Sequence, residues 1–300
     1  MVAEPDAPSE PALFEVDPAQ VGIRPKPVRL PARLSPSRAG DFVQCPLMFR
    51  FRSVDKLPEP PSPAATLGTL VHAVLERLFD KPAGARTPQA AHDLVPPEWE
   101  KLLAGRPQLA ELFDTPQAAA DWLASAGPLL DRYFTLEDPN RYEPARREWR
   151  VDTVIGEGED RLRVGGIIDR VDIAPNGMVR VVDYKTGKAP APAYESKVMF
   201  QMKFYALVLW RLRGTVPKRL QLIFMGSGSV LAYDPDERDL LATEQKIAAI
   251  WQAIRQAAAT REWPAKPSRL CDWCSFKPLC PAHGGEPPAA PEVIVTPVSE

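Results

Sequence analysis

The sequence predicts an α/β domain in which helices flank a mixed central sheet. Strand-like runs and amphipathic stretches follow one another in the order helix, three strands, helix, two strands, helix. From the first strand onward these segments lie at about 146–155, 162–173, 178–184, 194–213, 220–225, 230–233 and 236–260. The 300 residues are 45% hydrophobic and 25% charged, which is ordinary for a globular protein. Since no internal repeat is present, one domain is the simplest division.

Both ends of the chain are expected to be tails. Many of the 35 prolines lie near the two ends, and such a composition favours extended or disordered chain. We therefore expect disordered tails at 1–32 and 284–300 around a single domain at 33–283. No apolar run approaches the roughly 20 residues that span a bilayer, and the N-terminus does not resemble a signal peptide. The sequence thus predicts a cytoplasmic protein without membrane association.

The first part of the domain is expected to be helical. Ser35, followed by a proline, offers an N-cap for a short helix that ends near Cys45. Apolar residues at three-and-four spacing predict an amphipathic helix at 66–79, which carries His72. A helical insertion is expected at about 80–140.

The residues with the clearest chemical meaning lie in two predicted strands. Asp169 ends the segment Gly-Ile-Ile-Asp, and Asp183 and Lys185 belong to the segment Val-Val-Asp-Tyr-Lys. Side chains alternate along a strand, so Asp183 and Lys185 share one face, whereas Asp172 falls on the opposite face from Asp169. A turn at Gly177 would join the strands as a hairpin and set Asp169 across from Asp183. Two carboxylates whose mutual repulsion is relieved by a divalent cation, with a lysine beside them, are the minimal set of groups for metal-dependent hydrolysis of a phosphodiester.

The charge pattern limits the class of partner. A net charge of -2 argues against a globally basic nucleic-acid binder, but it is compatible with a local cationic groove. Arginines gather around the predicted strands, and such a run can equally be a solvated strand face. We expect the region of Arg147 and Lys203 to provide the cationic wall of a groove that contacts phosphates.

The cysteine pattern indicates a metal site. Cys271, Cys274 and Cys280 form a C-x2-C-x5-C cluster, and Cys45 lies far upstream. Thiols stay reduced in the cytoplasm, which favours a metal over a disulfide. Four thiolates suit either a structural zinc or an iron–sulfur cluster, and the spacing does not choose between them. In both cases the site would join the N-terminal helix to the C-terminal loop.

Together these motifs resemble the RecB-type nucleases of the PD-(D/E)XK superfamily, especially the iron–sulfur branch with the AddB C-terminal nuclease and the CRISPR-associated RecB-like exonucleases. The resemblance covers about residues 33–283 and implies a restriction-endonuclease-like core with a 4Fe–4S cluster on the four cysteines. The motifs that carry it are Gly68-Thr69-Leu70-Val71-His72, Gly166-x-Ile168-Asp169-Arg170, Asp183-Tyr184-Lys185 and Gln201-x3-Tyr205.

The resemblance also implies roles for these residues. His72, Asp169, Asp183 and the carbonyl of Tyr184 would bind Mg2+ or Mn2+. Lys185 would position or polarise the attacking water. These roles come from the resemblance and not from the spacing of the residues.

Supporting residues are implied in the same way. Gln201 and Tyr205 would support the site or touch the DNA, although their helix also packs on the sheet. Glu148 matches an acidic position that often precedes the second motif. Trp273 and Phe276 would either stack on bases or pack around the cysteine cluster.

The predicted function is a metal-dependent DNA nuclease, specifically an exonuclease acting on single-stranded DNA or DNA ends in repair or recombination. The chain has no G-x-x-x-x-G-K-[ST] phosphate loop, so a helicase partner would be a separate chain. A non-catalytic or partner-dependent DNA-binding iron–sulfur module, a redox sensor and a CRISPR-adaptation nuclease are the alternatives.

Overall fold

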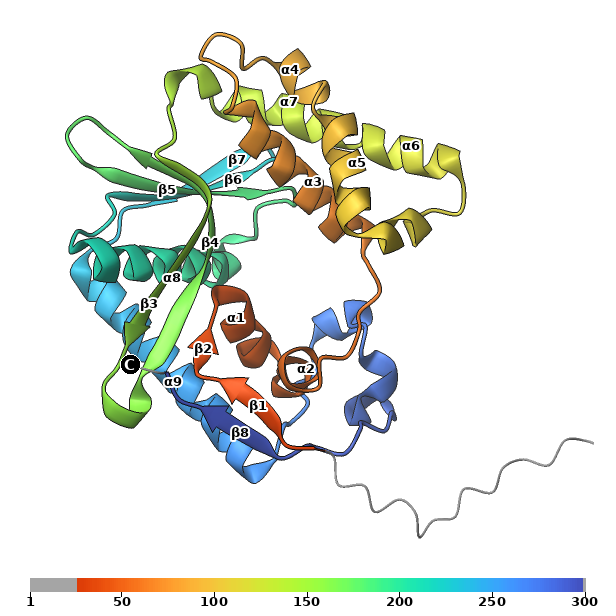
Figure 1. Cartoon of the computed structure of the whole chain (residues 1–300), viewed down its shortest axis with the longest axis vertical. Coiled ribbons are helices and arrows are strands. Elements are labelled where there is room, and N and C mark those ends of the chain that lie inside the picture. Colours follow the sequence, from red (N-terminus) through yellow and green to blue (C-terminus); the bar gives the residue numbers. More distant parts are fainter. Residues whose placement is uncertain (1–25, 299–300) are drawn as a thin grey trace, which may run out of the picture.

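A computed structural model describes residues 26–298, and its centre is a six-stranded mixed sheet (Figure 1). The strands run in the order β2-β4-β5-β6-β7, and β3 pairs with β4 as the sixth strand. With a separate two-stranded sheet, the strands are β1 (Val28–Pro31), β2 (Arg33–Leu34), β3 (Arg146–Ile155), β4 (Leu162–Ile173), β5 (Val179–Lys185), β6 (Arg219–Phe224), β7 (Ser229–Tyr233) and β8 (Val293–Thr296). The predicted α/β class is confirmed.

Helices cover both faces of the sheet (Figure 1). Helix α8 (Glu195–Arg213) lies on one face, and α9 (Glu237–Thr260) packs against α8 on the same side. Helices α3 (Pro63–Leu78) and α7 (Ala126–Leu136) cover the other face. The molecule therefore has three layers, with the sheet in the middle.

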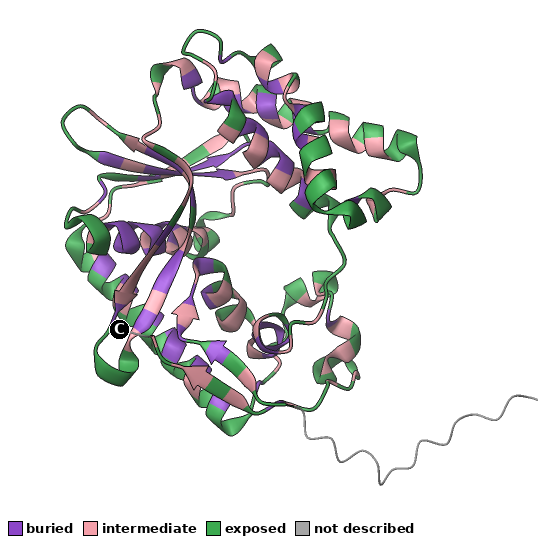
Figure 2. Cartoon of the chain, in the orientation of Figure 1, coloured by how far each residue is buried: buried purple, intermediate pink, exposed green. Residues whose placement is uncertain are grey.

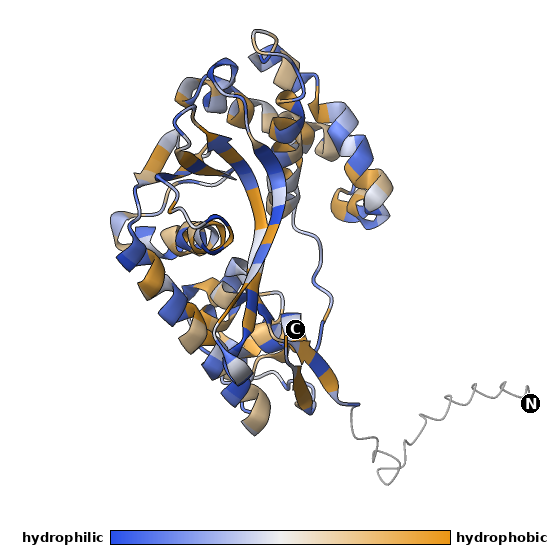
Figure 3. Ribbon diagram, turned by 60° about the vertical axis from the view of Figure 1, so that its left-hand side comes forward, coloured by the Kyte–Doolittle hydropathy of each residue, from blue (hydrophilic) through white to orange (hydrophobic). Residues whose placement is uncertain are grey.

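The sheet divides the core into two buried clusters. Val181 packs in the cluster that contains α8 and α9, whereas Val182 and Tyr184 pack in the cluster that contains α3 and α7. This alternation along β5 places Asp183 and Lys185 on the α8 side, as the sequence predicts. Buried residues concentrate in the central strands (Figure 2), and hydrophilic and hydrophobic residues alternate along the two long strands (Figure 3).

Shorter helices and turns complete the layers. The hydroxyl of Ser35 accepts a hydrogen bond of 3.3 Å from the backbone N–H of Arg38, so α1 begins at the predicted cap. The chain between 88 and 136 is largely helical. These elements are α1 (Pro36–Gln44), α2 (Pro46–Phe49), η2 (Arg50–Val54), α4 (Pro88–His92), α5 (Val95–Gly105), η3 (Pro107–Leu112), α6 (Pro116–Ala124), η4 (Pro139–Arg141), η5 (Gly158–Asp160), η6 (Pro192–Tyr194), η7 (Arg269–Trp273), η8 (Lys277–Leu279) and η9 (Pro281–His283).

Strand β4 has three partners, which leave part of one edge open. Strand β3 pairs with residues 162–171 on one edge. On the other edge β2 pairs in parallel with 163–164, and β5 pairs in antiparallel fashion with 170–173. In the described part of the chain, residues 165–169 therefore have no strand partner on this second edge. The open stretch ends at Asp169.

Two segments that were expected to be tails contain strands. β1 and β8 pair in parallel, from Val28 beside Val293 to Pro31 beside Thr296. The high proline content near both ends led to the expectation of tails and hid two short strands, so 32 and 284 do not mark the limits of the folded chain. The first 25 residues lie outside the described part. Within residues 26–298, no helix combines the length and the apolar character needed to cross a membrane.

Candidate active site

Three carboxylates lie in a row across β3, β4 and β5. The pairing of Arg170 with Val182 sets Asp169 opposite Asp183, one position further along the hairpin. The residue pairs on either side of Glu148 set it opposite Asp169 on the other edge of β4. Residues that oppose each other on neighbouring strands point to the same face, so the three acidic groups face one space.

His72 of α3 joins this group. Its Nδ1 lies 3.5 Å from Asp169 Oδ2 and 3.9 Å from Glu148 Oε1, and its Nε2 lies 2.9 Å from the carbonyl oxygen of Tyr184. One ligand atom each from His72, Glu148 and Asp169 lies within 4.8 Å of the other two. The helix thus brings an imidazole to two carboxylates that come from separate strands.

This donor set fits a divalent cation. His72 Nε2 lies at hydrogen-bond distance from the Tyr184 carbonyl oxygen, so a tautomer with its proton on Nε2 leaves Nδ1 as a metal ligand on the side of Asp169 and Glu148. In addition, the buried Oδ2 of Asp183 has no hydrogen-bond donor among the described residues. Lys185 Nζ is 2.6 Å from this oxygen, but the contact is an ion pair without hydrogen-bond alignment. A buried oxygen without a donor suits a cation ligand.

Lys185, Asp183 and Gln201 form a polar cluster on the α8 side of the sheet. Gln201 Nε2 donates to Asp183 Oδ1 at 2.8 Å, and Lys185 Nζ donates to Gln201 Oε1 at 3.1 Å. One amide therefore orients both the acid and the lysine. The side chain of Asp183 is 3% exposed and that of Lys185 is 30% exposed, so the ammonium group remains accessible from solvent.

Burial and repulsion between the acids shift their pKa values. Burial, together with the charge of Asp183, raises the pKa of Asp169 to about 7, although the charge of His72 and a hydrogen bond of 2.7 Å from the Tyr184 N–H oppose this rise. Burial also raises the pKa of Glu148. A bound cation would favour the ionised form of each carboxylate. Perturbed acids that converge in this way are typical of functional sites.

Glu148 has an unusual backbone conformation. Its φ of 40° lies in the left-handed region, within a strand and without the freedom of glycine. Such a conformation costs on the order of 1–3 kcal/mol and persists only where the surroundings enforce it. The strained residue is the one that faces Asp169 and His72. Sequence analysis predicted only a supporting or DNA-contacting role for Glu148, because backbone strain leaves no signature in the residue type.

Gly166 allows Tyr205 to lie against β4. A Cβ atom at Gly166 would come within 2.9 Å of Tyr205 Cε1, closer than real side chains approach. Burial raises the pKa of Tyr205 to about 12, so its hydroxyl is neutral at physiological pH. The predicted pair on α8 therefore reaches the strands in two ways, because Gln201 bonds directly to Asp183 and Tyr205 packs on Gly166.

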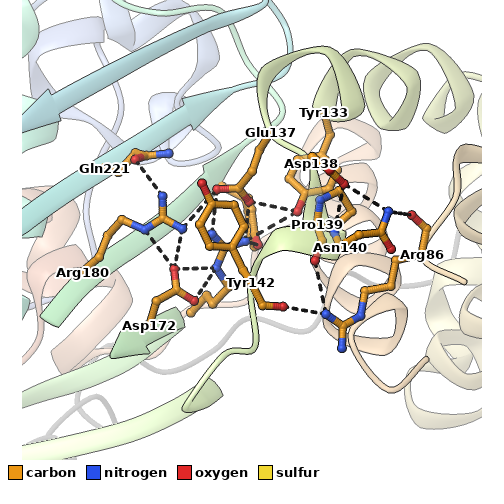
Figure 4. Close-up of polar contacts among 12 residues, drawn as sticks. Arg86, Tyr133, Glu137, Asp138, Pro139, Asn140, Tyr142, Asp172, Arg180 and Gln221 are labelled. Atoms are coloured by element: carbon orange, nitrogen blue, oxygen red, sulfur yellow. Dashed lines mark hydrogen bonds and ion pairs between the residues drawn. The ribbon is translucent and has the colours of Figure 1, made fainter. Parts of the chain in front are cut away.

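A buried ion-pair network lies on the opposite face of the same strands (Figure 4). Arg170 is fully buried and donates to both carboxylate oxygens of Glu137, at 2.6 and 2.8 Å, and to the hydroxyl of Tyr184, at 2.8 Å. Arg180 bridges Glu137 and Asp172. No sequence pattern singled out Glu137, because it follows α7 and meets the sheet only in the folded chain.

The two cations expected in the wall of a DNA groove are already compensated. Arg147 Nη2 lies 2.8 Å from Asp80, and a second nitrogen of the same guanidinium donates to a backbone carbonyl of α3. Lys203 Nζ lies 2.9 Å from Asp239 Oδ1 and 3.1 Å from the hydroxyl of Tyr233. These side chains do not supply free positive charge.

The four cysteines line one cavity. Cys45 directly follows α1, and Cys271, Cys274 and Cys280 come from the turns η7 to η9. All four are free thiols. In the described part of the chain, no three of the four sulfur atoms lie within 4.8 Å of one another.

The two aromatic residues of the cysteine segment have different environments. Phe276 is 4% exposed and packs against Phe51, with ring centroids 5.2 Å apart. Trp273 is 78% exposed. Phe276 is therefore a core residue, and only Trp273 remains accessible.

This chain is similar to a known protein family and to individual known proteins. A model described as the PD-(D/E)XK nuclease superfamily matches residues 33–281. The curated relative "Gene 69 protein" of Mycobacterium phage D29 is 23% identical over 278 residues, which cover 85% of this chain and 98% of that protein. A crystal structure from Eubacterium rectale, named "Putative exonuclease", is similar with a TM-score of 0.50 and 11% identity. The match covers 81% of this chain and 92% of that one, and it shows a similar fold.

Proposed function

Because this chain belongs to the PD-(D/E)XK nuclease superfamily, we propose that it hydrolyses phosphodiester bonds of DNA with the help of a divalent cation. The observation that carries the proposal is the meeting of Asp169, Asp183 and Lys185 in one space, where His72 and Glu148 add two further ligand groups. Opposed carboxylates with an accessible ammonium group beside them match the charge requirements of phosphodiester hydrolysis.

The ligands would be one imidazole and several oxygens. We assign His72, Asp169, Asp183 and the Tyr184 carbonyl to a Mg2+ or Mn2+ ion, and we add Glu148 because it lies within ligand distance of His72 and Asp169. Hard oxygen donors with a single imidazole suit these two metals. When bound, the cation would neutralise charge on the phosphate and lower the pKa of a water molecule.

The side chains around the ligands have separate tasks. Lys185 provides a fixed positive charge where negative charge develops on the phosphate, and it orients the attacking water. Gln201 is a positioning residue, since it holds Lys185 and Asp183 in place. Tyr205 keeps α8 in contact with β4 through Gly166.

The substrate class follows from the resemblance of the motifs. We propose an exonuclease for single-stranded DNA or DNA ends, acting in repair or recombination, to which a separate helicase would deliver single strands. The open edge of β4 beside Asp169 supports access by a single strand.

We also propose that the cysteine cavity holds a 4Fe–4S cluster. This assignment is supported by four free thiols that come from both ends of the matched region and line one cavity. The cluster would stabilise the fold by joining α1 to the C-terminal turns.

The nuclease proposal is tested with protein purified without oxygen and with end-labelled single- and double-stranded DNA. Cutting is expected with Mg2+ or Mn2+, and it should disappear with EDTA or with Lys185→Ala. Lys218→Ala is the matched control, because this exposed lysine precedes β6 at the far end of β5 from Lys185. Its activity should equal that of the wild type.

Two outcomes would overturn the proposal. One is folded wild-type protein that binds DNA but does not cut it with either metal, which indicates a DNA-binding module. The other is a Lys185→Ala variant that cuts as fast as the wild type, which places the chemistry elsewhere.

A further inference from the structure

A groove of about 610 Å³ lies beside the carboxylates. It is formed by the junction of β2 and α1, by the open stretch of β4 and by the first half of α8. Gln201 and Tyr205 line it, so it is continuous with the site described above. Its volume falls within the range of pockets that enclose small ligands, which suits a short length of single strand better than a duplex.

The groove is lined by cations without acids. Arg33, Arg38, Arg150 and Lys197 face it, and no Asp or Glu is among its lining residues. Among residues 26–298, none of these four side chains has a carboxylate oxygen within 4.0 Å, although many other arginines on the surface form such pairs. In a protein with a net charge of -2, this is a local concentration of uncompensated positive charge.

One of these cations is held in place before any ligand binds. Arg38 donates from Nη1 to the carbonyl of Arg33 at 3.1 Å and from Nε to the hydroxyl of Ser53 at 3.2 Å, and it lies over the ring of Phe49. Its Nη2 has no hydrogen-bond partner among the described residues. Burial and the nearby charge of Arg33 lower the pKa of Arg38, with partial compensation from Asp41. An anion in the groove would relieve this repulsion.

The groove extends in register from the carboxylates. Arg150 pairs with Ile167 across β3 and β4, two positions along from the pair of Glu148 and Asp169, and both residues line the groove. Two residues along a strand span about 7 Å, comparable with the spacing of neighbouring phosphates in an extended DNA strand. Ile167 is 39% exposed and offers an apolar surface beside the cations.

We propose that this groove binds the phosphate next to the one being hydrolysed, with Arg33, Arg38, Arg150 and Lys197 as the positioning cations for a single DNA strand. The assignment rests on the proposed nuclease function and adds the path of the substrate strand to it. Cations that contact phosphates fix the register of a nucleic acid without reading its sequence. A nuclease that cuts at a fixed step along the strand needs such a register.

The test measures DNA binding without hydrolysis. Fluorescent single-stranded oligonucleotides are titrated in EDTA with the wild type and with the double variant Arg150→Gln/Lys197→Gln, which changes two exposed cations. The matched control is Arg213→Gln/Lys218→Gln, which removes two exposed cations near the opposite end of α8. Each loss of a charged hydrogen bond should weaken binding by about tenfold. The negative slope of log affinity against log salt should become shallower by about 1.4 when two phosphate contacts are lost.

Oligonucleotides with a 5′-phosphate or a 5′-hydroxyl, and a circular strand, separate two sources of the same ligand. If the Arg150→Gln/Lys197→Gln variant binds only the linear 5′-phosphorylated DNA more weakly than the wild type does, the groove binds a terminal phosphate. If the variant binds all three DNAs more weakly to the same extent, the groove binds internal phosphates. Both results support the groove. Equal affinities and salt slopes for the wild type and the Arg150→Gln/Lys197→Gln variant would overturn it.

The two proposals fail separately. If the wild type cuts DNA but the groove variant binds like the control variant, the nuclease stands and the groove is wrong. If the wild type does not cut but binding depends on the groove cations, the groove stands and the nuclease is wrong. Circular dichroism of both double variants verifies that they are folded.

Discussion

Arg170 donates a 2.8 Å hydrogen bond to the hydroxyl of Tyr184, and so it connects β4 to β5 on the face opposite to Asp169 and Asp183. Arg170 follows Asp169, and Tyr184 lies between Asp183 and Lys185. Each of the two residues is therefore the immediate neighbour of a group in the candidate site. The buried network fixes the rotation of both strands, and with it the direction of the side chains on the other face.

Removing the anion of this network should destabilise the protein strongly. Glu137→Gln leaves Arg170 buried with only part of its compensation, and breaking a buried pair costs about 3–5 kcal/mol. Urea unfolding measures the loss. Asp131→Asn, on the exposed side of α7, is the control and should change the free energy of unfolding by less than about 1 kcal/mol. Equal stabilities of the two variants would contradict a structural role for Glu137.

The metal-free protein should lose stability as the pH rises. The pKa of Asp169 is about 7 in the folded protein, above the usual value of about 3.9 in an unfolded chain. Between these values the folded state binds more protons, so this residue lowers the free energy of unfolding as the pH rises towards 7. Urea unfolding in EDTA at pH 5.5 and 8 should show a decrease that Asp169→Asn lacks.

The affinity for a divalent cation should depend on the same proton of Asp169, but it should increase with pH. A cation competes with the proton on Asp169, so affinity for Mn2+ should rise between pH 5.5 and 8 and level off above the pKa. Calorimetry in two buffers would detect the released proton. A pH-independent affinity would show that Asp169 is ionised before the metal binds.

Two substitutions at Glu148 should separate its charge from its backbone strain. Glu148→Gln removes the charge and keeps the strain, whereas Glu148→Asn removes the charge and tolerates the left-handed conformation better. Both should weaken Mn2+ binding by about tenfold or more. In the metal-free protein both variants lose a buried charge, and Glu148→Asn should exceed Glu148→Gln in free energy of unfolding by about 1 kcal/mol because it also relieves the strain. Binding of Mn2+ at the wild-type affinity by both variants would exclude Glu148 from the ligand set.

Replacing one thiol should remove the 4Fe–4S cluster that we propose for the cysteine cavity. Cys45→Ser is expected to lose iron and visible absorbance after anaerobic reconstitution. Its midpoint of thermal unfolding should fall, because the cluster would no longer join α1 to the C-terminal turns. Lys185→Ala is the control and should retain both properties. Metal analysis of the wild type decides the identity, since one zinc per chain without iron would contradict the cluster.

The fold and the strand positions of the candidate site follow from short-range patterns. Alternation along β5 was sufficient to place Asp183 and Lys185 on one face, and a turn signal was sufficient to bring Asp169 opposite Asp183. The same alternation predicted that Asp172 lies on the opposite face from Asp169, and it belongs to the ion-pair network there. Periodicity predicts such relationships because it describes the chain locally.

Relationships between distant segments could not be predicted in this way. The charge of Arg147 is neutralised by Asp80, which lies in the turn after α3, and the cations of the groove come from three separate segments. The role of Glu137 depends on how α7 meets the sheet, and the conformation of Glu148 depends on packing. Residue type and spacing contain none of this information.

A cofactor held by all four cysteines would enter the protein at a defined stage of biosynthesis. The first of these cysteines, Cys45, and the last, Cys280, lie near opposite ends of the matched region. At 5–20 residues per second, on the order of 10–50 s separate their synthesis on the ribosome. All strands of the main sheet are made in the interval or before it, whereas a cofactor that needs all four thiols can enter only afterwards. Insertion of the cofactor would therefore report that synthesis has passed Cys280, and a chain that terminates before this residue could never acquire it.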